Sequence, residues 1–188
     1  MQNLHEAKFV KEECIDLIKK HKKDIEEGKN IHIDECHHLV VEETIDFHLN
    51  VLFKDFFIRG CIAIDCLKEM SDRFWGVNIN FFFGDDKDYP KKLARFKAKY
   101  QTLTDIAEML ENDRTSWATI FIRMRNDIEH KGFRLPDLEY VVSEDWNSFN
   151  ALIPLFDGKE IAEVLELLWE NVFTFCEDML VIMCSKDL

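Results

Sequence analysis

Apolar side chains recur every three or four positions along most of the chain, and this spacing predicts amphipathic α-helices. The expected helices span residues 4–27, 35–75, 90–111, 115–131 and 158–184. Gly60 falls on the apolar stripe of the longest of them, where a missing side chain permits a bend or the close approach of another helix. Helices with one apolar face and short connections favour an antiparallel bundle of four to five helices.

Other local signals set the helix limits and mark the irregular segments. The residues that can cap or stop the expected helices are Gly28, Asp34, Asp113 or Thr115, and Gly132. Segments 138–142 and 149–156 have strand-like composition on either side of a polar turn. They predict a small β-hairpin excursion near residues 138–156 of an otherwise all-α fold. Residues 77–83 fit either a short strand or an extended connection.

The composition agrees with one folded domain over residues 1–188. Hydrophobic residues make up 47% and charged residues 32% of the chain, and only six glycines and three prolines interrupt it. The first twenty residues lack the apolar segment of a secretory signal. The most apolar stretch contains Lys54, Asp55 and Arg59, which a helix facing lipid would avoid. We therefore expect a cytoplasmic protein without a membrane partner, whose cysteines are reduced and without chemical function.

The formal net charge of −13 counts against strong nonspecific binding of nucleic acid, because that affinity comes largely from neutralising phosphates. We expect no DNA partner. A local exception lies between residues 91 and 100, where Lys91, Lys92, Arg95 and Lys99 would share one face of a helix. This face is either an ordinary solvated surface or, together with Arg123, a candidate RNA-binding surface.

The fourth expected helix carries the main candidate for chemistry. Its core stripe consists of Trp117, Ile120, Phe121, Met124 and Ile128. At about 100° per residue, Asn126 and His130 face away from this stripe and Arg125 lies on its flank. A histidine can exchange protons with a ribose hydroxyl, and an arginine can hold a phosphate through two hydrogen bonds. The pattern suits phosphodiester chemistry without a metal ion, although a charged helix end without a catalytic role has the same spacing.

The segment Arg125-Asn126-Asp127-Ile128-Glu129-His130 resembles the R-N-x-x-x-H form of the motif that defines the HEPN superfamily of small helical-bundle proteins. Many members are metal-independent endoribonucleases of toxin–antitoxin, abortive-infection and RNA-processing systems, and others are binding or scaffolding modules. The resemblance implies that Arg125 and His130 are catalytic, that Asn126 supports them, and that two protomers form a composite site. It also implies an RNA substrate, an antitoxin or other protein partner, and no cofactor. The outward-facing groove likewise predicts a homodimer.

Two other classes of function remain open. Glu35, His38 and Glu42 would share one face of the second expected helix, a carboxylate–histidine pattern that di-iron bundles use, and Asp127 with His130 offers an incomplete second half. Alternatively, the chain is a non-catalytic interaction module that binds a protein or a nucleotide. Its acidic surface suits a basic protein partner.

Overall fold

The computed structural model describes residues 2–84 and 86–185. Its α-helices are α1 (Gln2–Glu26), α2 (Asp46–Trp75), α3 (Tyr89–Lys99), α4 (Thr104–Asp113), α5 (Thr119–His130) and α6 (Ile161–Ser185). A 3₁₀ helix, η1 (Asn80–Phe83), follows α2, and a π-helical turn, η2 (Arg114–Ala118), joins α4 to α5. The fold is therefore helical, as predicted. No helix in the described part of the chain is long and apolar enough to cross a membrane.

The strands form three small antiparallel pairs between the helices. They are β1 (Ile31–Ile33) with β2 (Leu39–Val41), β3 (Glu139–Val142) with β4 (Phe149–Leu152), and β5 (Leu155–Phe156) with β6 (Lys159–Glu160). The pair of β3 and β4 confirms the predicted hairpin excursion. Residues 77–83 contain no strand. Residues 77–79 are an irregular connection, and η1 occupies residues 80–83.

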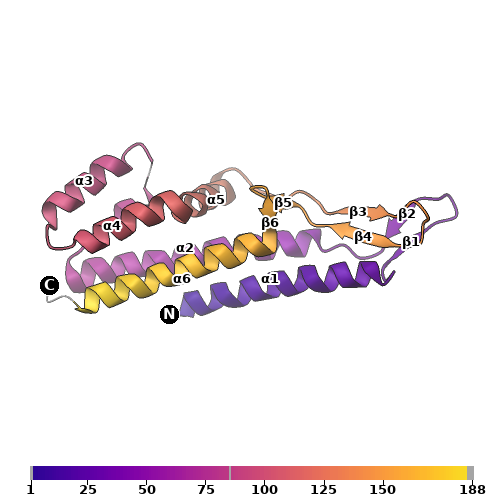
Figure 1. Cartoon of the computed structure of the whole chain (residues 1–188), viewed down its shortest axis with the longest axis horizontal. Helices are drawn as coiled ribbons and strands as arrows, with labels where there is room; N and C mark the ends of the chain where they lie inside the picture. Colours follow the sequence, from indigo (N-terminus) through magenta and orange to yellow (C-terminus); the bar gives the residue numbers. More distant parts are fainter. Residues whose placement is uncertain (1, 85, 186–188) are drawn as a thin grey trace.

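The long helices lie side by side and form the body of an elongated molecule (Figure 1). Helix α1 contacts α2 and α6, and α2 also contacts α5 and α6. Figure 1 shows α1 running in one direction along the long axis, and α2 and α6 running in the other. Helix α3 lies at one end of the molecule and the hairpins β1–β2 and β3–β4 lie at the opposite end. The main core fills the space between the helices and includes Phe53, Phe57, Phe121 and Phe175.

Helix α5 places the side chain of Phe121 directly against Gly60 of α2. A Cβ atom added to this glycine would lie 2.6 Å from Cζ of Phe121, a distance that real Cβ atoms do not adopt. The Phe121 ring is fully buried, and it packs against Phe57 with ring centroids 4.9 Å apart and against Trp117 at 6.0 Å. The prediction that Gly60 admits another helix is therefore confirmed, and the helix that it admits is the one carrying the candidate motif.

The predicted helix over residues 35–75 is wrong at its beginning, because residues 31–41 form the hairpin β1–β2 and α2 begins at Asp46. Asp34 does not cap a helix. Its Oδ1 accepts hydrogen bonds from the backbone N–H groups of Cys36 and His38, at 2.8 Å each, which turns the chain back on itself. His37 adopts a φ of 60°, in the left-handed region, at this turn.

The predicted helices over residues 90–111 and 115–131 have their boundary in the wrong place. The break lies at residues 100–103, whereas η2 carries the helix without interruption from α4 into α5. Thr115 does not cap a new helix, because its hydroxyl donates to the carbonyl groups of Glu111 and Asn112 one turn earlier. A hydroxyl that donates to the carbonyl groups of the preceding turn continues a helix instead of starting one.

A second, smaller core joins the two hairpins to the end of α1. Ile25, Ile31 and Ala151 are buried together there. Beside them, the buried His21 on α1 makes a 3.0 Å hydrogen bond between its Nε2 and the hydroxyl of Tyr140 on β3. This contact fastens the β3–β4 hairpin to α1, consistent with the packing of α1 against β4.

We expect Gly60→Ala to lower the free energy of unfolding by about 1–2 kcal/mol, because overpacking against the Phe121 ring exceeds the gain in helix propensity. Denaturant unfolding measures this loss. The variant Phe121→Leu makes room for the new methyl group, so the double variant Gly60→Ala/Phe121→Leu should be more stable than the sum of the single changes. Additive single changes would contradict the close approach described here.

Stability should fall as the pH falls below about 6.5, the ordinary pKa of histidine. Burial lowers the pKa of His21, although the nearby carboxylates of Asp46, Asp24 and Glu43 oppose the shift. The unfolded chain therefore binds more protons than the folded chain between the lowered pKa and 6.5. His21→Gln should flatten this part of the pH profile of unfolding, at a cost of about 1 kcal/mol near neutral pH from the lost bond to Tyr140. His48→Gln, at an exposed position, is the matched control for the replacement of a histidine by glutamine.

Candidate functional site

The candidate motif occupies the last two turns of α5, where the helix leaves the core. Phe121 and Met124 are buried, whereas Asn126 and His130 are exposed, as the spacing predicts. The helix ends at His130, and the backbone N–H groups of Lys131 and Phe133 both donate to the carbonyl of Asp127 at 3.1 Å. The exposed face of this helix end is therefore held in place by the backbone and by the buried face behind it.

Arg125, Glu129 and His130 form a chain of polar contacts on this helix end. Nε of Arg125 donates to Oε1 of Glu129 at 3.1 Å, an i,i+4 ion pair. The other carboxylate oxygen, Oε2, lies 3.7 Å from Nε2 of His130. The Arg125 side chain is 35% exposed and that of His130 is 71% exposed. Glu129 therefore connects the cation to the base, a role that the spacing alone did not assign to it.

The Arg125 guanidinium also faces α2, where Cys61 and Asp65 contribute to its electrostatic environment. Burial disfavours its charge, but the hydrogen bond and the negative charge of Glu129 outweigh burial, so the pKa of Arg125 is raised. Burial raises the pKa of the Cys61 thiol to about 12, which keeps it protonated. The thiol of Cys61 is therefore not a nucleophile at neutral pH.

Arg123 does not join this chain of contacts. Its guanidinium pairs with the carboxylate of Asp157 at 3.2 Å, and both side chains are half exposed. Asp157 lies in the turn between β5 and β6, so the pair links α5 to the segment that precedes α6.

The basic face of α3 forms a separate pocket of about 410 Å³. Of its predicted cations, Lys92, Arg95 and Lys99 line the pocket, whereas Lys91 does not contribute to it. The remaining lining residues, which the sequence did not indicate, are Asn78, Asn80, Phe81, Gly84, Phe96 and Tyr100. The predicted cationic face therefore exists, and an amide-bearing and aromatic wall from the segment after α2 faces it.

The wall of this pocket is held by the buried Arg114 at the start of η2. Its guanidinium donates to the carbonyls of Phe82 and Gly84, the latter at 2.8 Å, and pairs with the carboxylate of Asp86. It also lies over the ring of Tyr89, 4.9 Å from the centroid. The buried cation is thus satisfied by hydrogen bonds and an opposite charge, as burial of a charge requires.

The structure does not bring the two groups of predicted site residues together. Helix α3 lies at one end of the molecule, and α5 runs away from that end toward the hairpins (Figure 1). Within one copy of the chain, the cations of α3 and the motif of α5 therefore form two distinct surfaces.

The fold contradicts the alternative of a metal site in a di-iron bundle. Glu35, His38 and Glu42 do not share a helix face, because Glu35 and His38 lie in the turn between β1 and β2 and Glu42 directly follows β2. Glu42 faces a different partner, His32, whose Nδ1 is 3.4 Å from Oε1 of the glutamate. Asp127, the other expected half, pairs with Lys131 at 2.6 Å.

Comparisons with protein-family models, with curated proteins and with solved structures give no match for this chain. What the site can do therefore follows from its residues and their geometry.

Proposed function

We propose that this chain is a HEPN-like protein with an antiparallel helical bundle that cleaves RNA without a metal ion. Its setting would be RNA processing, a toxin–antitoxin pair or phage defence. The observation that carries the proposal is the exposed chain of Arg125, Glu129 and His130 at the end of α5, in the R-N-x-x-x-H spacing. The side-by-side arrangement of the long helices supports the bundle.

The residues fit transesterification at a ribose. His130 takes the proton of the 2′-hydroxyl, and the 2′-oxygen attacks the adjacent phosphorus. The bond from phosphorus to the 5′-oxygen then breaks, the proton taken up by His130 is returned to that oxygen, and a 2′,3′-cyclic phosphate is left. Arg125 stabilises the negative charge that develops on the phosphate by exchanging its bond to Glu129 for bonds to the phosphate oxygens. Glu129 remains beside the imidazole and orients it, and Asn126 donates to the phosphate or the ring.

The α3 pocket suits the phosphate backbone of the same RNA. Lys92, Arg95 and Lys99 bring three positive charges to a chain with a net charge of −13. Within the described residues, Arg95 has no hydrogen-bonding or ionic partner, and Lys92 has a single carboxylate, that of Asp88, at 3.7 Å. Cations that the fold leaves largely unneutralised are free to bind phosphates. Lys99 lies over the ring of Tyr100, 4.6 Å from its centroid, so this ring positions the cation at the pocket.

A binding-only role is the second candidate, and two observations favour it. Glu129 neutralises Arg125, so a phosphate must displace an existing ion pair. In addition, α2 exposes apolar side chains that include Phe47 and Phe74, which are 81% and 75% exposed. Such side chains are typical of surfaces that bind protein partners.

We expect the purified protein to cleave a mixed RNA substrate and to remain active in EDTA. His130→Ala should lower the cleavage rate by about 10²–10⁴-fold, because it removes the general base. Arg125→Ala should lower the rate by about 10²–10³-fold through the lost charge stabilisation. Gel analysis of the products, together with detection of the 2′,3′-cyclic phosphate, measures both effects.

Two controls separate the catalytic role from folding and from RNA binding. Arg134→Ala removes an exposed arginine beyond the end of α5 that the site does not use, and it should leave the cleavage rate within about twofold. Alanine at Lys92, Arg95 and Lys99 should raise KM and weaken its salt dependence, with a smaller effect on kcat. Cleavage that persists in the Arg125→Ala/His130→Ala variant would exclude this site. RNA that stays intact with the unmutated protein would leave the binding-only role.

We also propose that the chain forms a homodimer through α2. Val51, Ile58 and Ile62 lie along the exposed side of this helix and are each at least 40% exposed. Ile58 and Ile62 flank Cys61, which lies in the electrostatic environment of Arg125, so pairing of two copies here would bring two motifs near one interface.

Ile58→Glu/Ile62→Glu should weaken self-association at least about tenfold, equivalent to roughly 1.4 kcal/mol, because each charge would be buried in the interface. Sedimentation equilibrium measures the dissociation constant. Val181→Glu is the matched control, since Val181 is an apolar side chain that is 65% exposed on a different helix, α6. A monomer at micromolar concentration, or equal weakening by the control, would exclude an interface on α2.

A further inference from the structure

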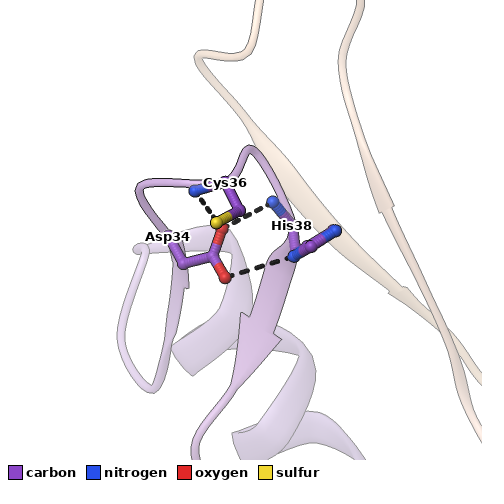
Figure 2. A group of neighbouring side chains, drawn as sticks. All are labelled: Asp34, Cys36 and His38. Carbon is purple, nitrogen blue, oxygen red and sulfur yellow. Dashed lines mark hydrogen bonds and ion pairs between the residues drawn. The ribbon is translucent and has the colours of Figure 1, made fainter.

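The turn between β1 and β2 brings together three side chains of the types that bind transition metals. Asp34, Cys36 and His38 each offer one ligand atom, and these three atoms lie within 4.8 Å of one another. Figure 2 shows the Cys36 sulfur beside the carboxylate of Asp34, with the His38 ring on the other side of that carboxylate. All three residues come from a five-residue segment, and no helix is involved.

The backbone of the turn already holds the three groups near each other. Oδ1 of Asp34 accepts the N–H groups of Cys36 and His38, so the carboxylate is fixed relative to both residues. Oδ2 is left to face Nδ1 of His38 at 3.3 Å. Cys36 is a free, exposed cysteine, so its sulfur is accessible to an ion from solvent.

The donor set selects the class of metal. We propose that Asp34, Cys36 and His38 bind one Zn²⁺ ion, through Oδ2, Sγ and Nδ1, with a water molecule in the fourth position. Thiolate, imidazole and carboxylate are the ligands that zinc takes in proteins, and the thiolate and the imidazole do not suit Mg²⁺ or Ca²⁺, which prefer oxygen ligands. Ligand atoms of a tetrahedral zinc ion lie roughly 3.5 Å apart. Side-chain rotations that move the ligand atoms by about 1 Å therefore bring all three within reach of one ion.

Zinc binding replaces hydrogen bonds and protons at this turn. The ion displaces the proton of the Cys36 thiol and any proton on Nδ1 of His38, so binding releases protons and strengthens as the pH rises. It leaves the two backbone bonds to Oδ1 of Asp34 in place. The bound ion would join both arms of the β1–β2 turn, because Asp34 follows β1 and His38 precedes β2.

This site differs from the di-iron alternative. Glu35 and Glu42 are not ligands, and no helix contributes. The proposal is also independent of the proposed cleavage of RNA, which uses no metal ion. Failure of either proposal leaves the other unaffected, because zinc binding is measured without RNA and the cleavage assay is run in EDTA.

The test is a titration of the metal-free, reduced full chain with Zn²⁺ in competition with a chromophoric chelator. We expect one zinc ion per chain. Cys36→Ser and His38→Gln should each weaken binding at least about tenfold, because each removes one of three protein ligands. Cys66→Ser and His48→Gln change another exposed cysteine and another exposed histidine, both on α2, and both variants should bind zinc as the unmutated chain does.

A second measurement identifies the sulfur ligand directly. Co²⁺, bound in place of zinc, should give a thiolate-to-cobalt charge-transfer band that Cys36→Ser abolishes and Cys66→Ser retains. Thermal unfolding of the metal-free variants checks that both remain folded. Absence of micromolar zinc binding, or binding that survives Cys36→Ser and His38→Gln unchanged, would overturn the proposal.

Discussion

The contact between Gly60 and Phe121 is the constraint on which the rest of the structure depends. The long helix α2 and the helix that ends in the candidate motif can approach closely because Gly60 has no Cβ atom. The Phe121 ring fills the space and continues into the aromatic core through Phe57 and Trp117. With Phe121 held inward, the opposite face of α5 must lie at the surface. A missing methyl group thus determines that a helix end rich in polar residues stays exposed.

Much of this arrangement could be predicted from the sequence, because it depends on periodicity. The stripe through Phe121 and Met124 determines which face of α5 is buried, and the position of Gly60 on its own stripe indicates a close approach. The exposure of Asn126 and His130 follows from the same spacing. Each of these properties is determined within a single helix, so the spacing of apolar residues along the sequence is enough to predict it.

The errors arise where one side chain can serve two kinds of local structure. An Asp before an apolar run can cap a helix or turn a hairpin, and Asp34 turns a hairpin because its carboxylate bonds to Cys36 and His38. Thr115 can likewise cap a helix or, within a helix, donate its hydroxyl to a carbonyl of the preceding turn. The site has a similar limit, since the sequence cannot tell which acid neutralises which base. Arg125 pairs with Glu129, whereas Arg123 pairs with Asp157. Only the packed structure shows that these two arginines have different partners.

The π-helical turn between α4 and α5 has a consequence for how this surface can evolve. A π turn contains one residue more than the α-helical turn that it replaces, and each residue rotates a helix by about 100°. The orientation of every side chain after Ala118 therefore depends on that extra residue. Loss of one residue within 114–118 would turn the polar motif toward the core and bring core residues to the surface, without altering a single residue of the motif. The chemistry at the end of α5 is thus encoded partly by the number of residues that precede it.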